Sequence, residues 1–238
     1  MADACAPAPV VLLSGANRGI GAAIVNELLP HGYRLSLGAR DPATLAAAFG
    51  PETARVLHAH FDAFEPASAE GWVTATIEKF GRIDVLINNA GSNEKVSLLE
   101  DDDAALDRLW AVNVKAPLRL TRLCVPHLER TGRGRIINIA SMSGKRVRNP
   151  FVGYNMTKFA VLGLTHTTRH VTWDQGIRAT AICPSFVRTD MTRESTKIGR
   201  DDMIAPETLA RIVRNTIELP NNAATAEVLV NCRLEDML

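Results

Sequence analysis

Short apolar runs alternate with longer amphipathic stretches along almost the whole chain. The first run, Val10-Val11-Leu12-Leu13, is apolar at every position, which is typical of a parallel strand that is buried on both faces. Comparable runs recur, and most are followed by a turn and a helical pattern. The predicted strands cover residues 10–13, 34–39, 56–61, 85–87, 135–140, 178–183 and 226–231.

The stretches between these strands have the spacing of amphipathic helices. After the first strand, Ile24 and Leu28 lie one helical turn apart. This alternation predicts a single α/β domain over residues 1–238, with about seven parallel strands in a doubly wound sheet and helices on both faces. Residues 1–9 are expected to be disordered, and the polar segment 189–204 is expected to form a lid. Further helices are predicted through residues 72–80, from the acidic residues 101–103 onward, over 154–173 and over 206–219.

The composition is that of an ordinary globular protein. Hydrophobic residues make up 46% of the 238 residues and charged residues 22%, which suits one large domain. A formal net charge of +1 is too small for a nucleic-acid-binding footprint, and no apolar run approaches the length of a membrane span. The first nine residues lack the basic and then apolar pattern of a secretory signal. We therefore expect a cytoplasmic protein with neither nucleic acid nor a membrane as its partner.

The cysteines favour the same compartment. Cys5, Cys124, Cys183 and Cys232 are widely separated, with neither C-x-x-C spacing nor nearby pairs of histidines. Thiols in this arrangement are typical of buried, free cysteines in a reducing cytosol. We expect no metal site.

A glycine-rich turn joins the first strand to the first helix. Gly15, Gly19 and Gly21 lie in the segment 14–21, directly after the apolar run and directly before the helical pattern. Glycines at such a turn let the backbone approach a phosphate closely, and the helix then offers unpaired N–H groups. A plain loop could carry the same glycines, but the strand before it and the helix after it are what the nucleotide-binding motif requires.

The ends of the second and third strands bear on the choice of cofactor. In dinucleotide-binding folds an acidic residue closes the second strand when NAD is bound, whereas an arginine there accommodates a 2′-phosphate. Here Ala39 stands in the acidic position and Arg40 follows it, with Arg18 as a possible second cation. This favours NADP, with NAD as the alternative, unless Arg40 is only a solvated loop charge. Asp62 could meet the adenine amino group or could equally cap a helix or turn.

Candidate proton-transfer residues follow the fifth strand. Tyr154 and Lys158 are four residues apart in a predicted helix, so they share one face, where the ammonium can lower the pKa of the phenol. Such a phenol can act as an acid or a base. Ser141 is delivered by the end of the fifth strand, and Asn113 is a polar amide among apolar helix positions that needs a partner if it is buried. Each of these alone is as readily a surface or core residue.

Taken together and in this order, these features resemble the short-chain dehydrogenase/reductase family, from Val10 to about Asn231. The resemblance implies a Rossmann-like fold and a metal-free, NAD(P)-dependent interconversion of an alcohol and a carbonyl on a small molecule. The features that carry it are the turn 14–21, the run Asn88-Asn89-Ala90-Gly91, Asn113, Ser141, Tyr154, Lys158 and the segment 184–189.

The resemblance also implies a role for each matching residue. Tyr154 would be the general acid or base, Lys158 would lower its pKa and bind the nicotinamide ribose, and Ser141 would hydrogen-bond the substrate oxygen. Asn113 would hold a water that links Lys158 to solvent, and Asn89 would lie near the adenosine side. Together with the positions discussed above, the predicted cofactor-binding set is Gly15, Asn17, Arg18, Gly19, Ile20, Gly21, Arg40, Asp62, Asn89, Ala90, Gly91, Tyr154, Lys158, Pro184, Ser185, Val187 and Thr189.

Some questions stay open at this stage. Ser143 is a nearby alternative to Ser141, and Ser185 stands where the family commonly has glycine, so it could narrow the nicotinamide pocket. Arg148 could bind a carboxylate on a polar substrate, or could be a solvated surface charge. The resemblance favours a homodimer or homotetramer built on the helix that starts near Tyr154 and the helix that carries Asn113. The competing function is a catalytically silent dinucleotide-binding sensor or scaffold.

Overall fold

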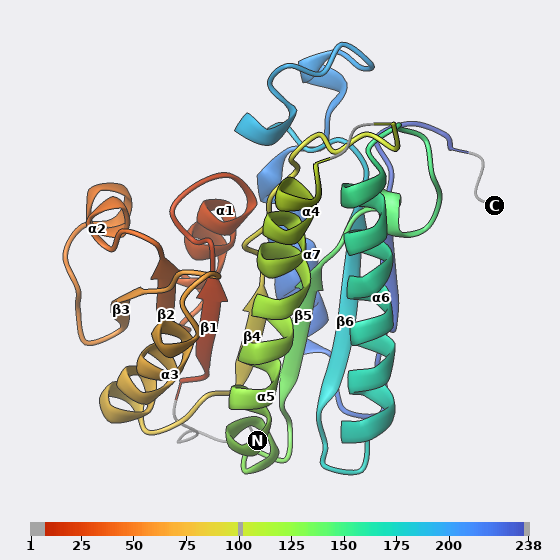
Figure 1. The fold of residues 1–238 in the computed structure, drawn as a ribbon. Coiled ribbons are helices and arrows are strands. Elements are labelled where there is room, and N and C mark those ends of the chain that lie inside the picture. Colours follow the sequence, from red (N-terminus) through yellow and green to blue (C-terminus); the bar gives the residue numbers. More distant parts are fainter. Residues whose placement is uncertain (1–7, 100–101, 236–238) are drawn as a thin grey trace.

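A parallel β-sheet forms the centre of the molecule (Figure 1). The computed structural model describes residues 8–99 and 102–235, and within these ranges seven strands pair in the order β3-β2-β1-β4-β5-β6-β7. The chain order reverses between β1 and β4, which is the point where ligands bind in doubly wound sheets. The strands are β1 (Val10–Ser14), β2 (Arg34–Ala39), β3 (Val56–His60), β4 (Val85–Asn88), β5 (Arg135–Ile139), β6 (Arg178–Pro184) and β7 (Glu227–Val230).

One face of the sheet is covered by α1 (Gly19–Leu28) and α7 (Pro206–Glu218), which pack against each other, with α2 (Ala43–Phe49) at the edge. Their apolar residues join those of β1 that point to this side, such as Val11 and Leu13, in the largest hydrophobic cluster. Helices α1 and α7 each bury one face against the sheet, whereas α2 buries only Leu45.

The opposite face carries α3 (Pro66–Phe80), α5 (Ala116–Glu129) and α6 (Val152–Thr172), which stand side by side in front of the sheet in Figure 1. Ahead of α5 come α4 (Asp103–Trp110) and a π-helical turn, η1 (Ala111–Lys115). The centre of this layer is Trp72, which is fully buried and donates from Nε1 to Ser36 Oγ at 2.8 Å. A Cβ on Gly38 would lie 2.5 Å from the Trp72 ring, so this strand position needs glycine.

The segment expected to be a lid lies beyond the carboxyl ends of the strands, at the top of Figure 1. It contains two short 3₁₀ turns, η3 (Asp190–Thr192) and η4 (Arg200–Asp202), and it reaches the rest of the molecule on three sides. Arg18 lies 3.9 Å from Asp190, Lys95 lies 3.5 Å from Glu194, and Lys197 donates to the Arg148 carbonyl at 3.1 Å. A third 3₁₀ turn, η2 (Met142–Gly144), follows β5.

The predicted fold class is confirmed, with the strands at the expected positions to within one or two residues. Of the acidic residues 101–103, Asp102 caps α4 by accepting the Ala105 N–H at 2.9 Å, and Asp101 lies outside the described residues. Residues 1–7, part of the segment expected to be disordered, also lie outside them. The π-helical turn η1 was not expected, because no sequence pattern distinguishes it from an ordinary helix.

Candidate active site

A long cleft of about 1130 Å³ runs along the carboxyl ends of the strands. It extends from the ends of β2 and β3, past the turn after β1, to the ends of β5 and β6. An extended cleft across the point where the strand order reverses matches the shape of a dinucleotide. Of the seventeen predicted cofactor-binding residues all but Gly21 line it.

Gly21 lies behind the wall of the cleft and shapes it. A Cβ on Gly21 would lie 2.1 Å from the Gly15 carbonyl oxygen and 2.7 Å from Asn89 Nδ2, so helix α1 packs against the turn more closely than any side chain allows. Gly15 and Gly19 have φ values of 66° and 57°, in the left-handed region that favours glycine. The turn therefore presents bare backbone at the start of a helix, which fits the pyrophosphate of a dinucleotide.

Hydrogen bonds formed by Ser14 and Asn89 join this turn to the loop after β4. Ser14 Oγ accepts the N–H groups of Asn89 and Ala90, both at 3.1 Å. In return, Asn89 Nδ2 donates to the carbonyls of Ser14 and Gly15 at 3.0 and 2.9 Å. The predicted adenosine-side residue thus has a second role that the sequence did not reveal, because its amide fixes the position of the glycine turn.

The end of β2 places a cation, Arg40, beside the adenosine end of the cleft. Ala39 is buried and Arg40 is exposed, and Arg40 lines the cleft together with Thr44. Asn17 Nδ2 donates to Thr44 Oγ1 at 3.2 Å, which joins the glycine turn to the start of α2. Arg18 also lines the cleft, but its guanidinium lies near Asp190 of the lid.

Asp62 has the turn-forming role considered from the sequence, and its contact with an adenine amino group stays a prediction. One carboxylate oxygen, Oδ1, accepts the Phe64 N–H at 2.9 Å in a tight turn, and the Asp62 N–H donates to Ser68 Oγ at 3.0 Å. Asp62 also lines the cleft next to Phe61. It is therefore a turn-forming residue at the edge where the adenine of a dinucleotide would lie.

Tyr154, Ser141 and Lys158 converge at the other end of the cleft, and all three line it. The hydroxyl groups of Tyr154 and Ser141 are hydrogen-bonded to each other. Lys158 is buried, its Nζ donates to the Ile139 carbonyl at 3.1 Å, and it lies 5.6 Å from the centre of the Tyr154 ring. The helix α6 thus places the phenol and the ammonium on one face, as the spacing predicted.

Burial dominates the electrostatics of this pair. Desolvation raises the pKa of Tyr154. The hydrogen bond with Ser141 lowers this pKa by a smaller amount, so the pKa stays above its ordinary value. Desolvation also lowers the pKa of Lys158 to about 8. The prediction of a lowered Tyr154 pKa is therefore wrong here, because the cost of burying a phenolate is the largest influence on the Tyr154 pKa.

Asn113 is buried under the site, and both the oxygen and the nitrogen of its side-chain amide form hydrogen bonds. Its Oδ1 accepts the Ser92 N–H at 2.8 Å, and its Nδ2 donates to the Ser92 carbonyl at 2.9 Å and to Thr157 Oγ1 at 3.1 Å. The side chain extends from the π-helical turn η1, and such turns are frequent at functional sites. The prediction that a buried Asn113 must find partners is confirmed, although it does not itself line the cleft.

Ser143 and Arg148 lie apart from the cleft. Ser143 is buried and accepts from Asn149 Nδ2 at 3.2 Å, while its N–H donates to Ser141 Oγ at 3.0 Å. Arg148 is exposed and does not line the cleft. Of the two serines, Ser141 is therefore the one whose hydroxyl faces the site.

Pro184, Ser185, Val187 and Thr189 form the wall beyond β6. The Ser185 hydroxyl accepts the Cys232 N–H at 3.0 Å and lies 3.2 Å from its Sγ. The extra side chain at this position thus contacts the segment that follows β7.

The outer part of the cleft contains polar residues that sequence reasoning missed. Arg108 of α4 and Glu94 form an ion pair at 2.9 Å, and both line the cleft next to Asn93. Met191 of the lid closes the same region. Only the fold brings these residues together, since Glu94 lies in an irregular loop and Arg108 on a helix that reads as a plain surface helix.

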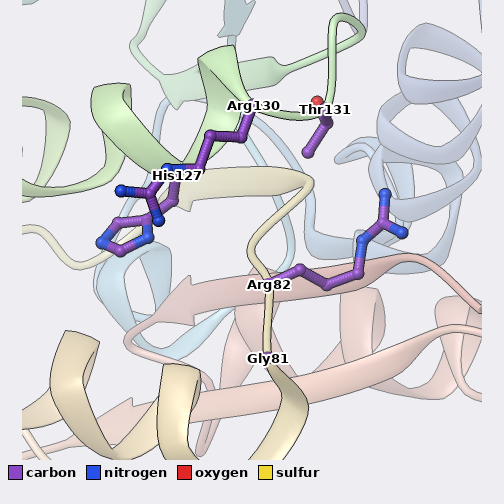
Figure 2. Close-up of a pocket in the computed structure, with 5 residues that line it drawn as sticks. All are labelled: Gly81, Arg82, His127, Arg130 and Thr131. Carbon is purple, nitrogen blue, oxygen red and sulfur yellow. The ribbon is translucent and has the colours of Figure 1, made fainter.

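A second hollow, of about 330 Å³, lies near the amino ends of β4 and β5, between Gly81, Arg82 and the end of α5 (Figure 2). Its basic side chains do not converge, because Arg82 extends away from His127 and Arg130 and pairs with Asp84.

Within residues 8–99 and 102–235 no group of His, Cys, Asp and Glu side chains is placed to hold a metal ion. No helix in the described part of the chain is long and apolar enough to cross a membrane.

Comparisons with known proteins agree with this geometry. The family model described as short chain dehydrogenase matches residues 9–198. An agropine synthesis reductase from Rhizobium rhizogenes is 53% identical over 96% of this chain, but the chain spans only 54% of that protein. The solved 3-ketoacyl-(acyl-carrier-protein) reductase from Brucella melitensis, complexed with NADH, superposes with a TM-score of 0.83 at 26% identity, covering 94% of this chain and 97% of that one. An alcohol dehydrogenase from the archaeon Thermococcus sibiricus, complexed with 5-hydroxy-NADP, has a TM-score of 0.83 at 27% identity, covering 93% and 95%.

Proposed function

Because this chain belongs to the short-chain dehydrogenase/reductase family of oxidoreductases, we propose that it interconverts a carbonyl and an alcohol on a small polar molecule with NADP(H). The observation that carries the proposal is the convergence of Tyr154, Ser141 and Lys158 at one end of a dinucleotide-shaped cleft. Of the three residues, only Tyr154 carries a hydroxyl that is acidic enough to donate a proton at that point.

In the proposed reaction, the nicotinamide ring supplies the hydride to the carbonyl carbon, or accepts it in the reverse direction, when the cofactor is bound. Tyr154 donates its phenolic proton to the carbonyl oxygen, and Ser141 stabilises the negative charge that grows there. Lys158, held by the Ile139 carbonyl, keeps a positive charge near the phenolate that remains. Asn113 and Thr157 hold the helix that carries Tyr154 and Lys158 at the correct depth.

The preference for NADP rests on Arg40. Arg40 is exposed, lines the adenosine end of the cleft and follows Ala39, so no carboxylate closes β2 against a 2′-phosphate. A guanidinium binds phosphate oxygens well. Asp41, which follows Arg40 and also lines the cleft, uses its Oδ1 to accept the Ala43 N–H at 2.9 Å. Removing Arg40 should therefore weaken NADPH binding and leave NADH binding nearly unchanged.

A polar substrate, reduced rather than oxidised, is part of the proposal. Asn93, Glu94 and Arg108 give the outer cleft a charged, hydrogen-bonding wall, which an acyl chain would not match. The name of the relative at 53% identity, agropine synthesis reductase, supports the reductive direction. Because the chain spans about half of that relative, its substrate is carried over only as part of this proposal. Arg148 as a carboxylate ligand stays a prediction.

The test is NADPH oxidation by the purified protein with a panel of polar ketones and aldehydes, with and without a carboxylate, beside a long-chain acyl thioester. The proposal expects turnover of a polar carbonyl and little of the thioester. Arg40→Ala should raise the NADPH Kd about 10- to 100-fold, which corresponds to losing one charged hydrogen-bonding group. Arg122→Ala, an exposed arginine of α5 outside the cleft, is the matched control and should change nothing. Tight binding of NADPH with no turnover of any carbonyl would instead favour the silent sensor or scaffold.

A homo-oligomer in a reducing, cytoplasmic environment completes the proposal. Met156 and Phe159 are half-exposed on the outer face of α6, which supports a dimer or tetramer built on that helix. Cys124 and Cys183 are buried free thiols, as suits a reducing compartment. Light scattering that finds only monomers at micromolar concentration would contradict the oligomer.

A further inference from the structure

The loop between Ser141 and Tyr154 carries two adjacent basic residues, and both are held by acidic residues from the last part of the chain. Lys145 Nζ lies 2.8 Å from Glu227 of β7, which also accepts from His166 of α6. Arg146 pairs with Glu235 through its Nη2. The Arg146 side chain is 13% exposed and that of Glu235 only 1%, so this second pair is a buried one.

The same loop is internally rigid and leads directly to the catalytic hydroxyls. Met142 accepts the N–H groups of Lys145 and Arg146 through its carbonyl, and the Ser143 N–H donates to Ser141 Oγ. Farther along, Asn149 bonds both Ser143 and Asn155, which lies next to Tyr154 on α6. A displacement at Arg146 would therefore pass to Ser141 on one side and to Tyr154 on the other.

The segment after β7 is fixed at its other end to the wall of the cleft. The Cys232 N–H donates to Ser185 Oγ, and the Ser185 N–H donates to the Val230 carbonyl at 2.9 Å. In Figure 1 the chain after β7 passes along the loop that precedes α6. Residues 230–235 thus span from the end of β6 to the loop that carries Arg146.

We propose that Glu235, supported by Glu227, is a positioning residue: the segment after β7 holds the loop 142–150 so that Ser141 and Tyr154 keep their catalytic geometry. This inference rests on the proposed reductase function. Surface ion pairs contribute little to stability, but removing one charge of a largely buried pair leaves the other charge uncompensated, which is strongly destabilising. The sequence alone shows no link, since Arg146 and Glu235 are 89 positions apart.

The experiment compares Glu235→Gln with Glu235→Asp, which keeps the charge. The control is Glu27→Gln, because the Glu27–Arg214 pair at 2.7 Å is a partly buried ion pair that joins α1 to α7 far from Ser141. Amide hydrogen exchange of residues 142–153, and kcat and KM for a reducible carbonyl, are measured in the NADPH-saturated protein. The NADPH Kd is measured separately by titration.

The proposal expects Glu235→Gln to speed exchange of the loop and to lower kcat about tenfold or more, with the NADPH Kd changed less than about twofold. Glu235→Asp should recover most of kcat, and Glu27→Gln should change neither loop exchange nor kcat. If Glu235→Gln and Glu27→Gln show the same loop exchange and the same kcat, the proposal is overturned. Faster loop exchange with an unchanged kcat would overturn the positioning role.

Two further results keep the test decisive. If Glu235→Gln does not fold, the double variant Arg146→Met/Glu235→Leu removes both buried charges together, which is often tolerated. It should melt near the wild-type temperature and still show a mobile loop and a low kcat, and a normal loop and kcat in it would overturn the proposal. If the wild type turns over no carbonyl, the proposed reductase function fails, whereas loop exchange still reports separately whether Glu235 holds the loop.

Discussion

The Asn113 amide nitrogen lies 3.1 Å from Thr157 Oγ1, and this contact joins the π-helical turn to the helix that carries Tyr154 and Lys158. Thr157 is one residue before Lys158, is fully buried and does not line the cleft. The hydroxyl also donates to the Tyr154 carbonyl at 2.9 Å. A buried threonine thus supports the site without touching any ligand.

We predict that Thr157→Val, which keeps the shape and removes the hydroxyl, lowers both stability and kcat. One donor of the buried Asn113 amide loses its acceptor, which costs about 1–3 kcal/mol. The control is Thr168→Val on the same helix, where the lost hydroxyl only bonds the Leu164 carbonyl. Thermal unfolding and steady-state kinetics of the two variants provide the comparison, and equal losses in both would show that Thr157 has no special role.

Gly21→Ala should abolish cofactor binding more completely than any single charge removal. The new Cβ would lie 2.1 Å from the Gly15 carbonyl oxygen, so α1 must move away from the glycine turn. We expect the NADPH Kd to rise at least about 100-fold, since the cradle and the helix N-terminus are displaced together. Gly71→Ala in α3, where a Cβ meets nothing within 4 Å, should keep wild-type binding and gain about 0.5–1 kcal/mol of stability.

Lys158→Met should change the pH dependence of stability in a defined direction. Burial lowers the folded-state pKa of Lys158 from 10.5 to about 8, so between these pH values the unfolded chain binds more protons than the folded one. The free energy of unfolding of the wild type therefore rises with pH across this window, and the cost of the buried charge is greatest below pH 8. At pH 7 the Lys158→Met protein should be the more stable by up to about 3 kcal/mol. Chemical unfolding at pH 7 and pH 10.5 tests this, and a difference that does not shrink at the higher pH would contradict the shift.

The sequence was sufficient for the fold class, the strand positions and the glycine turn, because each of these depends on local patterns. A buried parallel strand followed by Gly15, Gly19 and Gly21 has few other physical uses, and Tyr154 and Lys158 share a helix face by spacing alone. The expected burial of Asn113 followed from one polar residue among apolar positions.

Features that depend on contacts between separate segments could not be predicted from the sequence. The pairing of Glu94 with Arg108 arises only when the irregular loop after β4 folds against α4, and that of Arg146 with Glu235 only when the segment after β7 meets the loop before α6. The raised pKa of Tyr154 was missed for a different reason, because helical spacing reveals the nearby lysine but not the extent of burial. The direction of a pKa shift at a buried site can be predicted only when the fold is known.

The most direct test of the central claim is to compare Tyr154→Phe with the wild type in NADPH binding and in the reduction of a carbonyl that the wild type turns over. Phenylalanine keeps the ring beside Lys158 and removes only the hydroxyl that donates the proton. The account predicts an NADPH Kd within about twofold of the wild type and a kcat lowered by about 100-fold or more. A Tyr154→Phe enzyme with an unchanged kcat would contradict the account, because the proton would then come from another group.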